Sequence, residues 1–139
     1  MFSRFGRDWN GRRGGSMLGS QQIMTFVGTR DPARAKAFYR DTLGLRLVSE
    51  DGFAVVFDAN GIMLRVTTVH ELGGAKYTVL GWHVPDIGAA VRELHAAGVQ
   101  FERYEGLPQD ESGIWTAPGG ARMAWFKDPD GNVLSVAQL

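Results

Sequence analysis

The chain contains no cysteine among its 139 residues, which excludes disulfides, thiolate chemistry and metal centres held by cysteine. It also lacks a net charge, because 15 Lys and Arg side chains balance 15 Asp and Glu side chains. Proteins that coat nucleic acid or an anionic membrane need a basic excess, so we expect neither partner. No apolar run approaches the roughly 20 residues that span a bilayer, and residues 1–20 lack the apolar core of a signal peptide. We therefore expect a cytoplasmic protein.

What the chain does contain is typical of one globular domain, with 44% hydrophobic and 22% charged residues. Residues 1–20 stand apart, because they are rich in Gly, Arg and Ser and show no helix or strand period. We interpret them as a flexible basic leader, disordered or left over from cloning. An arm that contacts nucleic acid is the alternative. The domain itself is predicted over residues 21–139.

Two segments of the domain repeat one pattern of a β-rich run, an amphipathic helix, a glycine and another β-rich run. The first is IMTFVGTRDPARAKAFYRDTLGLRLV and the second is TVLGWHVPDIGAAVRELHAAGVQF. Asp31 and Asp86 are predicted N-caps, since their side chains can accept from free amides of the first helical turn. Gly44 and Gly98 are predicted to end the helices, where a left-handed residue is favoured.

A second repeat is more exact, since residues 53–66 (FAVVFDANGIMLRV) align without gaps on residues 123–136 (MAWFKDPDGNVLSV). Each copy indicates a strand, a tight turn that ends in Gly61 or Gly131, and a second strand. Asp-Pro-Asp-Gly at 128–131 is therefore interpreted as a turn and not as a carboxylate pair. The chain is predicted to be an α+β fold of two βαβββ modules, at about 21–68 and 76–139, with a long irregular segment at about 103–120.

These motifs resemble the vicinal oxygen chelate superfamily, which includes glyoxalases, bleomycin-resistance proteins and extradiol dioxygenases. The resemblance rests on DPARAKAFYRDTLGL at 31–45 and FKDPDGNVLS at 126–135, and it covers about residues 22–138. It implies that two βαβββ modules in tandem form a half-open barrel, a cup around the site. It also implies a homodimer, arranged side by side or with exchanged modules.

Metal enzymes of this superfamily place one ligand on each of four strands, usually His or Gln, Glu, His and Glu. In this sequence the resemblance places those positions at Met24, Arg65, Val79 and Ser135. A thioether suits soft copper(I), a guanidinium opposes a cation, valine has no lone pair, and serine is a poor neutral ligand. We therefore expect no metal cofactor, and metal-dependent glyoxalase or dioxygenase chemistry is placed in doubt.

Alternation along the strands predicts what else lines the cup. The candidate ligand-binding residues are mostly apolar, with three polar groups among them: Met24, Phe26, Met63, Arg65, Val79, His83, Trp115, Trp125 and Ser135. Arg65 is either a planar fork for a ligand carboxylate or phosphate, or a structural residue that pairs with an internal acid or extends its guanidinium to solvent. His83 is either a general base or ligand anchor, or a hydrogen-bonded wall residue. Trp82 is predicted to face the core.

The sequence thus favours a superfamily member that lacks the usual metal ligands and binds a small aromatic or anionic organic molecule in an apolar cup. The alternative is a glyoxalase-type lyase, isomerase or dioxygenase. Such an enzyme would use non-standard metal ligands, or metal-free chemistry with His83 and Arg65 as the candidate catalytic residues.

Overall fold

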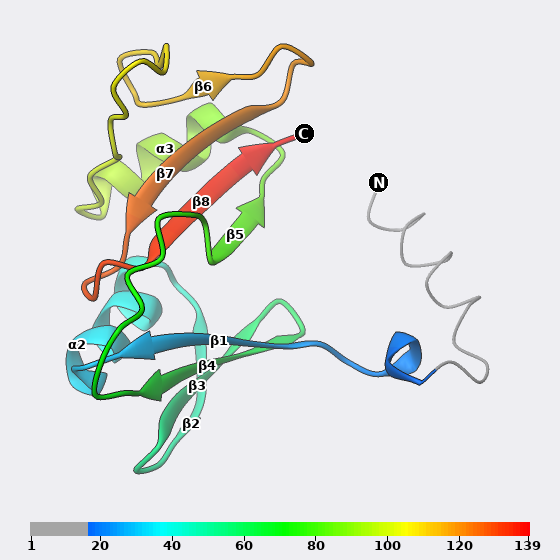
Figure 1. Cartoon of the computed structure of the whole chain (residues 1–139), viewed down its shortest axis with the longest axis vertical. Coiled ribbons are helices and arrows are strands. Elements are labelled where there is room, and N and C mark those ends of the chain that lie inside the picture. Colours follow the sequence, from blue (N-terminus) through cyan, green and yellow to red (C-terminus); the bar gives the residue numbers. More distant parts are fainter. Residues whose placement is uncertain (1–16) are drawn as a thin grey trace.

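The computed structural model describes residues 17–139, and it contains the predicted tandem of two modules (Figure 1). The predicted leader falls mostly outside the described residues, and its last part forms the short 3-10 helix η1 (Leu18–Ser20). The first module consists of β1 (Met24–Thr29), α2 (Pro32–Ala37), the π-helical turn η2 (Phe38–Thr42), β2 (Arg46–Glu50), β3 (Ala54–Ala59) and β4 (Ile62–Thr68). The second consists of β5 (Leu80–His83), α3 (Ile87–Ala96), β6 (Trp115–Thr116), β7 (Arg122–Lys127) and β8 (Val133–Gln138).

Both helices begin and end as their sequences predict. The side chain of Asp31 accepts from the Arg34 N–H, and that of Asp86 accepts from the Ala89 N–H. Gly44 and Gly98 follow the helices with φ of 78° and 99°, the left-handed conformation that a residue without Cβ adopts at little cost. The helix boundaries are therefore fixed by local chemistry.

Each module forms a four-stranded mixed sheet in which the first strand pairs in parallel with the last. The strand order is β1-β4-β3-β2 in the first sheet, called here the N-sheet, and β5-β8-β7-β6 in the second, the C-sheet. The two sheets remain separate and leave the barrel half open. The repeat is less exact than predicted after α3. The β-rich run there forms no strand; Phe101 makes an isolated bridge to Phe126, and β6 takes the edge position.

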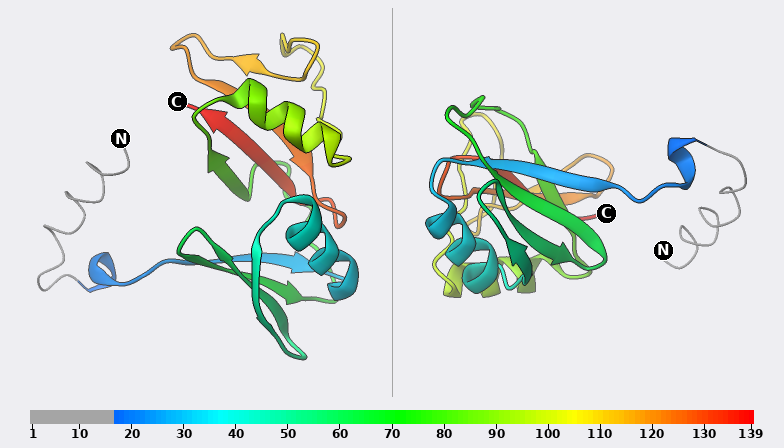
Figure 2. Two further views of the ribbon diagram at one scale, coloured as in Figure 1. Left: turned by 180° about the vertical axis from the view of Figure 1, so that it is seen from behind. Right: turned by 90° about the horizontal axis from the view of Figure 1, so that it is seen from below.

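The helices α2 and α3 lie on the same side of the two sheets (Figure 2). One hydrophobic core joins both modules beneath them, and it includes Tyr39 and Phe57 from the first and Phe126 and Leu134 from the second, all 0% exposed. Trp82 packs against this core, as predicted. The opposite face of each sheet carries no helix and is called here its open face. No helix among residues 17–139 is long and apolar enough to cross a membrane.

The turn at 128–131 joins the two modules. The buried carboxylate of Asp128 accepts hydrogen bonds from the Tyr39 hydroxyl (2.7 Å) and from the backbone and side chain of Asn132. The Asn132 side chain also donates to the Gly28 carbonyl, and the Arg30 N–H donates to Asp130 Oδ1. Desolvation, and then the negative charge of Asp128, raise the pKa of Tyr39, so its hydroxyl remains a donor. The turn that the sequence predicts is thus a contact between modules.

Candidate ligand-binding site

The open face of the N-sheet carries the predicted apolar side chains on adjacent strands. Met24 lies beside Met63, and Phe26 lies beside Arg65, because β1 and β4 pair in this register. Met24 is 47% exposed, Phe26 is 58% exposed and Met63 is 40% exposed. The alternate residues of β1 are buried in the core, with Val27 5% exposed. Successive side chains of β1 therefore point alternately to the open face and to the core, as strand alternation predicts.

Arg65 lies half-buried between Phe26 on β1 and Val56 on β3. Within residues 17–139, no hydrogen bond or ion pair holds its guanidinium to another side chain or to the backbone. Its electrostatic neighbour is Asp51, whose pKa is lowered mainly by the Phe53 and Ala54 N–H groups and less by Arg65. An ion pair with an internal acid is therefore not formed within residues 17–139, and the guanidinium donors are left to solvent or to a ligand.

Three aromatic rings gather on the open face of the C-sheet. The rings of Trp115 and Trp125 lie 6.1 Å apart between centroids, and the ring of Tyr104 meets Trp125 edge-on at 5.5 Å. All three keep part of their surface in solvent, so they offer an aromatic wall. Burial, and then the charge of Glu102, raise the pKa of Tyr104, which leaves its hydroxyl a donor.

Ser135 and His83 share this open face. Ser135 pairs with Gly81 on β5 and with Trp125 on β7, so it lies beneath the aromatic wall. A Cβ at position 81 would approach the Ser135 hydroxyl oxygen to 2.7 Å, and only glycine leaves room for that side chain. His83 lies half-buried at the end of β5, two residues further along the same face.

The segment before β6 holds the aromatic residues in place through its own hydrogen bonds. The Gln109 side chain donates to the Glu102 and Gly113 carbonyls and accepts from the Tyr104 N–H. The Asp110 carboxylate accepts from the Ser112 and Ile114 N–H groups. The predicted irregular segment is thus an ordered loop, and its polar side chains satisfy the backbone that would otherwise form a strand.

The nine predicted site residues form two groups, one on each open face. Met24, Phe26, Met63 and Arg65 are neighbours on the N-sheet, and Val79 precedes β5 with its N–H bonded to the Val133 carbonyl beside the C-sheet group. Val56 and Met123 are not among the predicted residues, but they lie next to Arg65 and Trp115. Met123 is two residues before Trp125, so strand alternation would have predicted it on the same face. Val56 could not be predicted in this way, because β3 is a continuous apolar run in which the two faces cannot be told apart.

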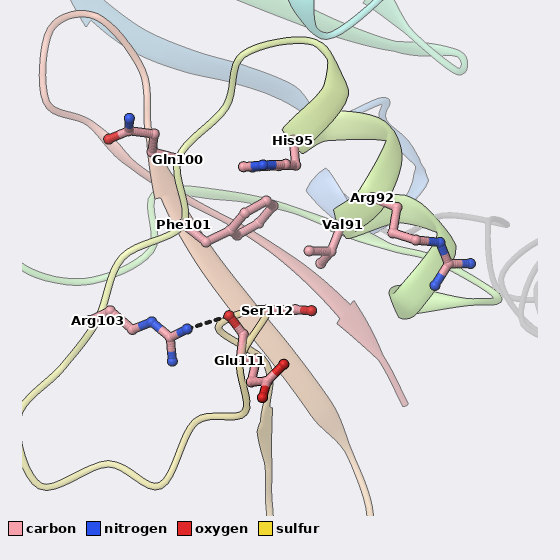
Figure 3. Close-up of a pocket in the computed structure, with 8 residues that line it drawn as sticks. All are labelled: Val91, Arg92, His95, Gln100, Phe101, Arg103, Glu111 and Ser112. Atoms are coloured by element: carbon pink, nitrogen blue, oxygen red, sulfur yellow. Dashed lines mark hydrogen bonds between the residues drawn. The ribbon is translucent and has the colours of Figure 1, made fainter.

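A hollow of about 440 Å³ lies on the other side of the C-sheet, between α3 and the loop (Figure 3). Its floor is Val91 and Phe101. The two guanidiniums at its rim are poorly placed for a ligand, because Arg103 donates to the Asp110 and Glu111 carbonyls and Arg92 points away from the hollow (Figure 3). The Arg103 contacts instead link the start of the loop to residues 110 and 111 further along it.

Comparison with known proteins places this geometry in a family. The profile of the Glyoxalase/Bleomycin resistance protein/Dioxygenase superfamily matches residues 21–136. The chain belongs to this superfamily. A search of curated proteins finds no significant match. The tandem βαβββ fold that the sequence predicts is therefore confirmed.

Solved structures of the superfamily share the fold. Lactoylglutathione lyase from Agrobacterium tumefaciens is 25% identical, with a TM-score of 0.59, over 85% of this chain and 93% of that chain. The glyoxalase family protein from Enterococcus faecalis is 19% identical, with a TM-score of 0.66, over 85% and 98%. A glyoxalase/bleomycin resistance protein/dioxygenase from Alicyclobacillus acidocaldarius is 18% identical, with a TM-score of 0.62, over 85% and 90%.

The four positions that the superfamily resemblance assigns to metal ligands lie in strands or beside them. Met24 and Arg65 lie on adjacent strands of the N-sheet, while in the C-sheet region Val79 is bonded to Val133, two residues before Ser135 on β8. Their donor set is a thioether, a guanidinium, a hydrocarbon and a hydroxyl. A divalent metal does not fit this set, because the cation Arg65 would oppose it and Val79 offers no lone pair.

Proposed function

We propose that this protein binds a small organic molecule with an aromatic part and an anionic part on the open faces of its two sheets, without a metal. The observation that carries the proposal is Arg65, a half-buried guanidinium without an ion pair among the described residues. A partly desolvated guanidinium is stabilised by two parallel hydrogen bonds to a carboxylate or phosphate.

The aromatic wall supports the other half of the proposal. Trp115, Trp125 and Tyr104 are held by the loop and by the sheet, so they need little reordering when a ring binds against them. Apolar side chains around a few polar groups are the usual composition of small-molecule sites. The protein would then act by holding its ligand, as a binding protein.

A thermal-shift screen tests this function, because a ligand that binds the folded state raises the melting temperature. We expect aromatic carboxylates to raise it in a dose-dependent manner and neutral amides of the same acids to raise it less. Thiol conjugates and glycopeptide antibiotics complete the screen. If neutral and anionic analogues stabilise equally, or no aromatic acid stabilises, the proposed ligand class is wrong.

We expect the purified protein to contain no stoichiometric divalent metal, because the four positions supply no suitable ligands. Elemental analysis after a chelator wash measures this directly. About one zinc, iron, manganese or nickel per chain, retained through the wash, would contradict the proposal and favour an enzyme with ligands other than the four positions.

An enzyme of glyoxalase or dioxygenase type is the second candidate, and the 25% identity to lactoylglutathione lyase favours it. In that case His83 and Arg65 are the candidate residues for proton transfer and anion stabilisation. Turnover of a screened ligand, abolished in His83→Ala, would establish the enzyme over the binding protein.

We also propose a homodimer. Val48 on the edge strand β2 and Phe53 after it are exposed apolar side chains in the single chain, and a second copy at this edge would remove them from water. Light scattering on a sizing column measures the mass, and a monomer at micromolar concentration would contradict this part of the proposal.

A further inference from the structure

A second hollow lies on the helix side of the molecule, where the two modules meet. It measures about 490 Å³, a volume in the range of small-molecule sites. The end of η2 and the residues after it form one wall, from Asp41 to Gly44. The last turns of α3 form the other, and the strands below supply the floor. It lies on the helix side of the sheets, away from the open faces.

The floor of this hollow is apolar and belongs to the core. Trp82, Val84, Phe126 and Val136 form it, and Ala90 and Leu94 of α3 form its side together with the C-cap residue Ala97. The two small alanines leave the space that a bulkier residue would fill. A ligand in this hollow would therefore bury apolar surface against both modules at once.

The electrostatics of the hollow favour a positive charge. Two helices end at it, since η2 ends at Thr42 and α3 ends at Ala96, and the C-terminal end of a helix carries a partial negative charge. Its lining contains the acids Asp41 and Glu93 and one histidine, His83, and neither lysine nor arginine. Arg40 pairs with Asp41 at 2.8 Å, whereas Glu93 has no ion pair within residues 17–139. The net charge at the rim is therefore negative.

The wall that η2 forms contains an extra residue. The segment from Asp31 to Gly44 is one residue longer than the equivalent segment from Asp86 to Gly98. The extra residue is accommodated by a π-helical turn, in which the N–H of Leu43 donates to the carbonyl of Phe38, five residues earlier (3.0 Å). Turns of this kind are rare and are found frequently at functional sites. Here the turn places Asp41, Thr42 and Leu43 around the hollow.

We propose that this hollow is a second binding site, which takes a small apolar molecule with one positive charge, such as an arylalkylammonium ion. The apolar part lies on Trp82, Leu94 and Phe126, and the ammonium group lies between Glu93 and the ends of the two helices. The site shares only His83, at the end of β5, with the proposed site on the open faces, and its ligand carries the opposite charge.

Binding of 2-phenylethylammonium to the full chain, followed by NMR of the isotopically labelled protein, tests the site. The neutral isostere 2-phenylethanol and the anion phenylacetate are the comparison probes. We expect the ammonium to bind several-fold more tightly than the alcohol and to shift the amides of Leu43, Ala90, Glu93 and Ala97. Shifts confined to Phe26, Arg65 and Trp125, or binding no tighter than that of the alcohol, would overturn the proposal.

Two variants with matched controls complete the test. Ala90→Phe fills the hollow and should weaken ammonium binding by more than about tenfold, whereas Ala96→Phe, exposed on the same helix, should not. Glu93→Gln should weaken it by about threefold, as expected for an exposed charge pair, and Glu105→Gln should leave it unchanged. Equal binding by Ala90→Phe and the parent would exclude the hollow, and circular dichroism verifies that each variant is folded. Arg65→Ala should leave ammonium binding intact, so the two sites can fail separately.

Discussion

Replacing Arg65 by alanine should weaken the binding of an aromatic carboxylate by about 10- to 100-fold, as a lost charge-assisted pair of hydrogen bonds predicts. The guanidinium lies half-buried between Phe26 and Val56 and makes no ion pair among the described residues. Its removal therefore leaves no buried acid without a partner, and the melting temperature without ligand should change little. Calorimetric titration measures the affinity.

Arg65→Lys separates charge from geometry. Lysine keeps the positive charge but loses the planar fork, so we expect an intermediate affinity. Arg92→Ala is the matched control, because it removes an exposed guanidinium from α3, on the other side of the sheet. Equal affinity in Arg65→Ala and the parent would exclude the anion site, whereas equal losses in Arg65→Ala and Arg92→Ala would indicate an effect of net charge alone.

Asp128→Ala should lower the free energy of unfolding by about 3–5 kcal/mol, which is typical of the loss of a buried hydrogen-bonded acid. Asp128 is 5% exposed and accepts from Tyr39, from the Asp130 N–H, and from the backbone and side chain of Asn132. Without the carboxylate, the Tyr39 hydroxyl is left buried without its acceptor, and the contact between the modules is weakened. Urea unfolding measures the change.

The sequence repeat provides a control for this prediction. Asp58 is the equivalent of Asp128 in the first module, but it is partly exposed, and within residues 17–139 it accepts only from the Gly61 N–H and the Arg46 guanidinium. Asp58→Ala should cost about 1 kcal/mol, the value of an ordinary turn contact. If both variants lose the same stability, Asp128 acts as a turn residue and not as a contact between the modules.

The structure also explains why the two sites differ in what could be predicted. The open faces follow from strand alternation, so Phe26, Arg65, Trp125 and Ser135 are identifiable from the sequence. The second hollow is formed by the end of one helix and the side of another, brought together by the packing of two modules. No periodicity or motif in the sequence predicts that these distant segments pack next to each other.

The sequence by itself determined the tandem βαβββ fold, because caps, left-handed glycines, tight turns and alternation are governed by interactions within a few residues. Only the tertiary structure decided that Arg65 makes no ion pair with the acids of residues 17–139, that Tyr39 donates to Asp128, and that the run after α3 forms no strand. These features depend on contacts between segments far apart in the chain. The local sequence is compatible with many side-chain and strand partners, and only the packing of the folded chain determines which of them come into contact.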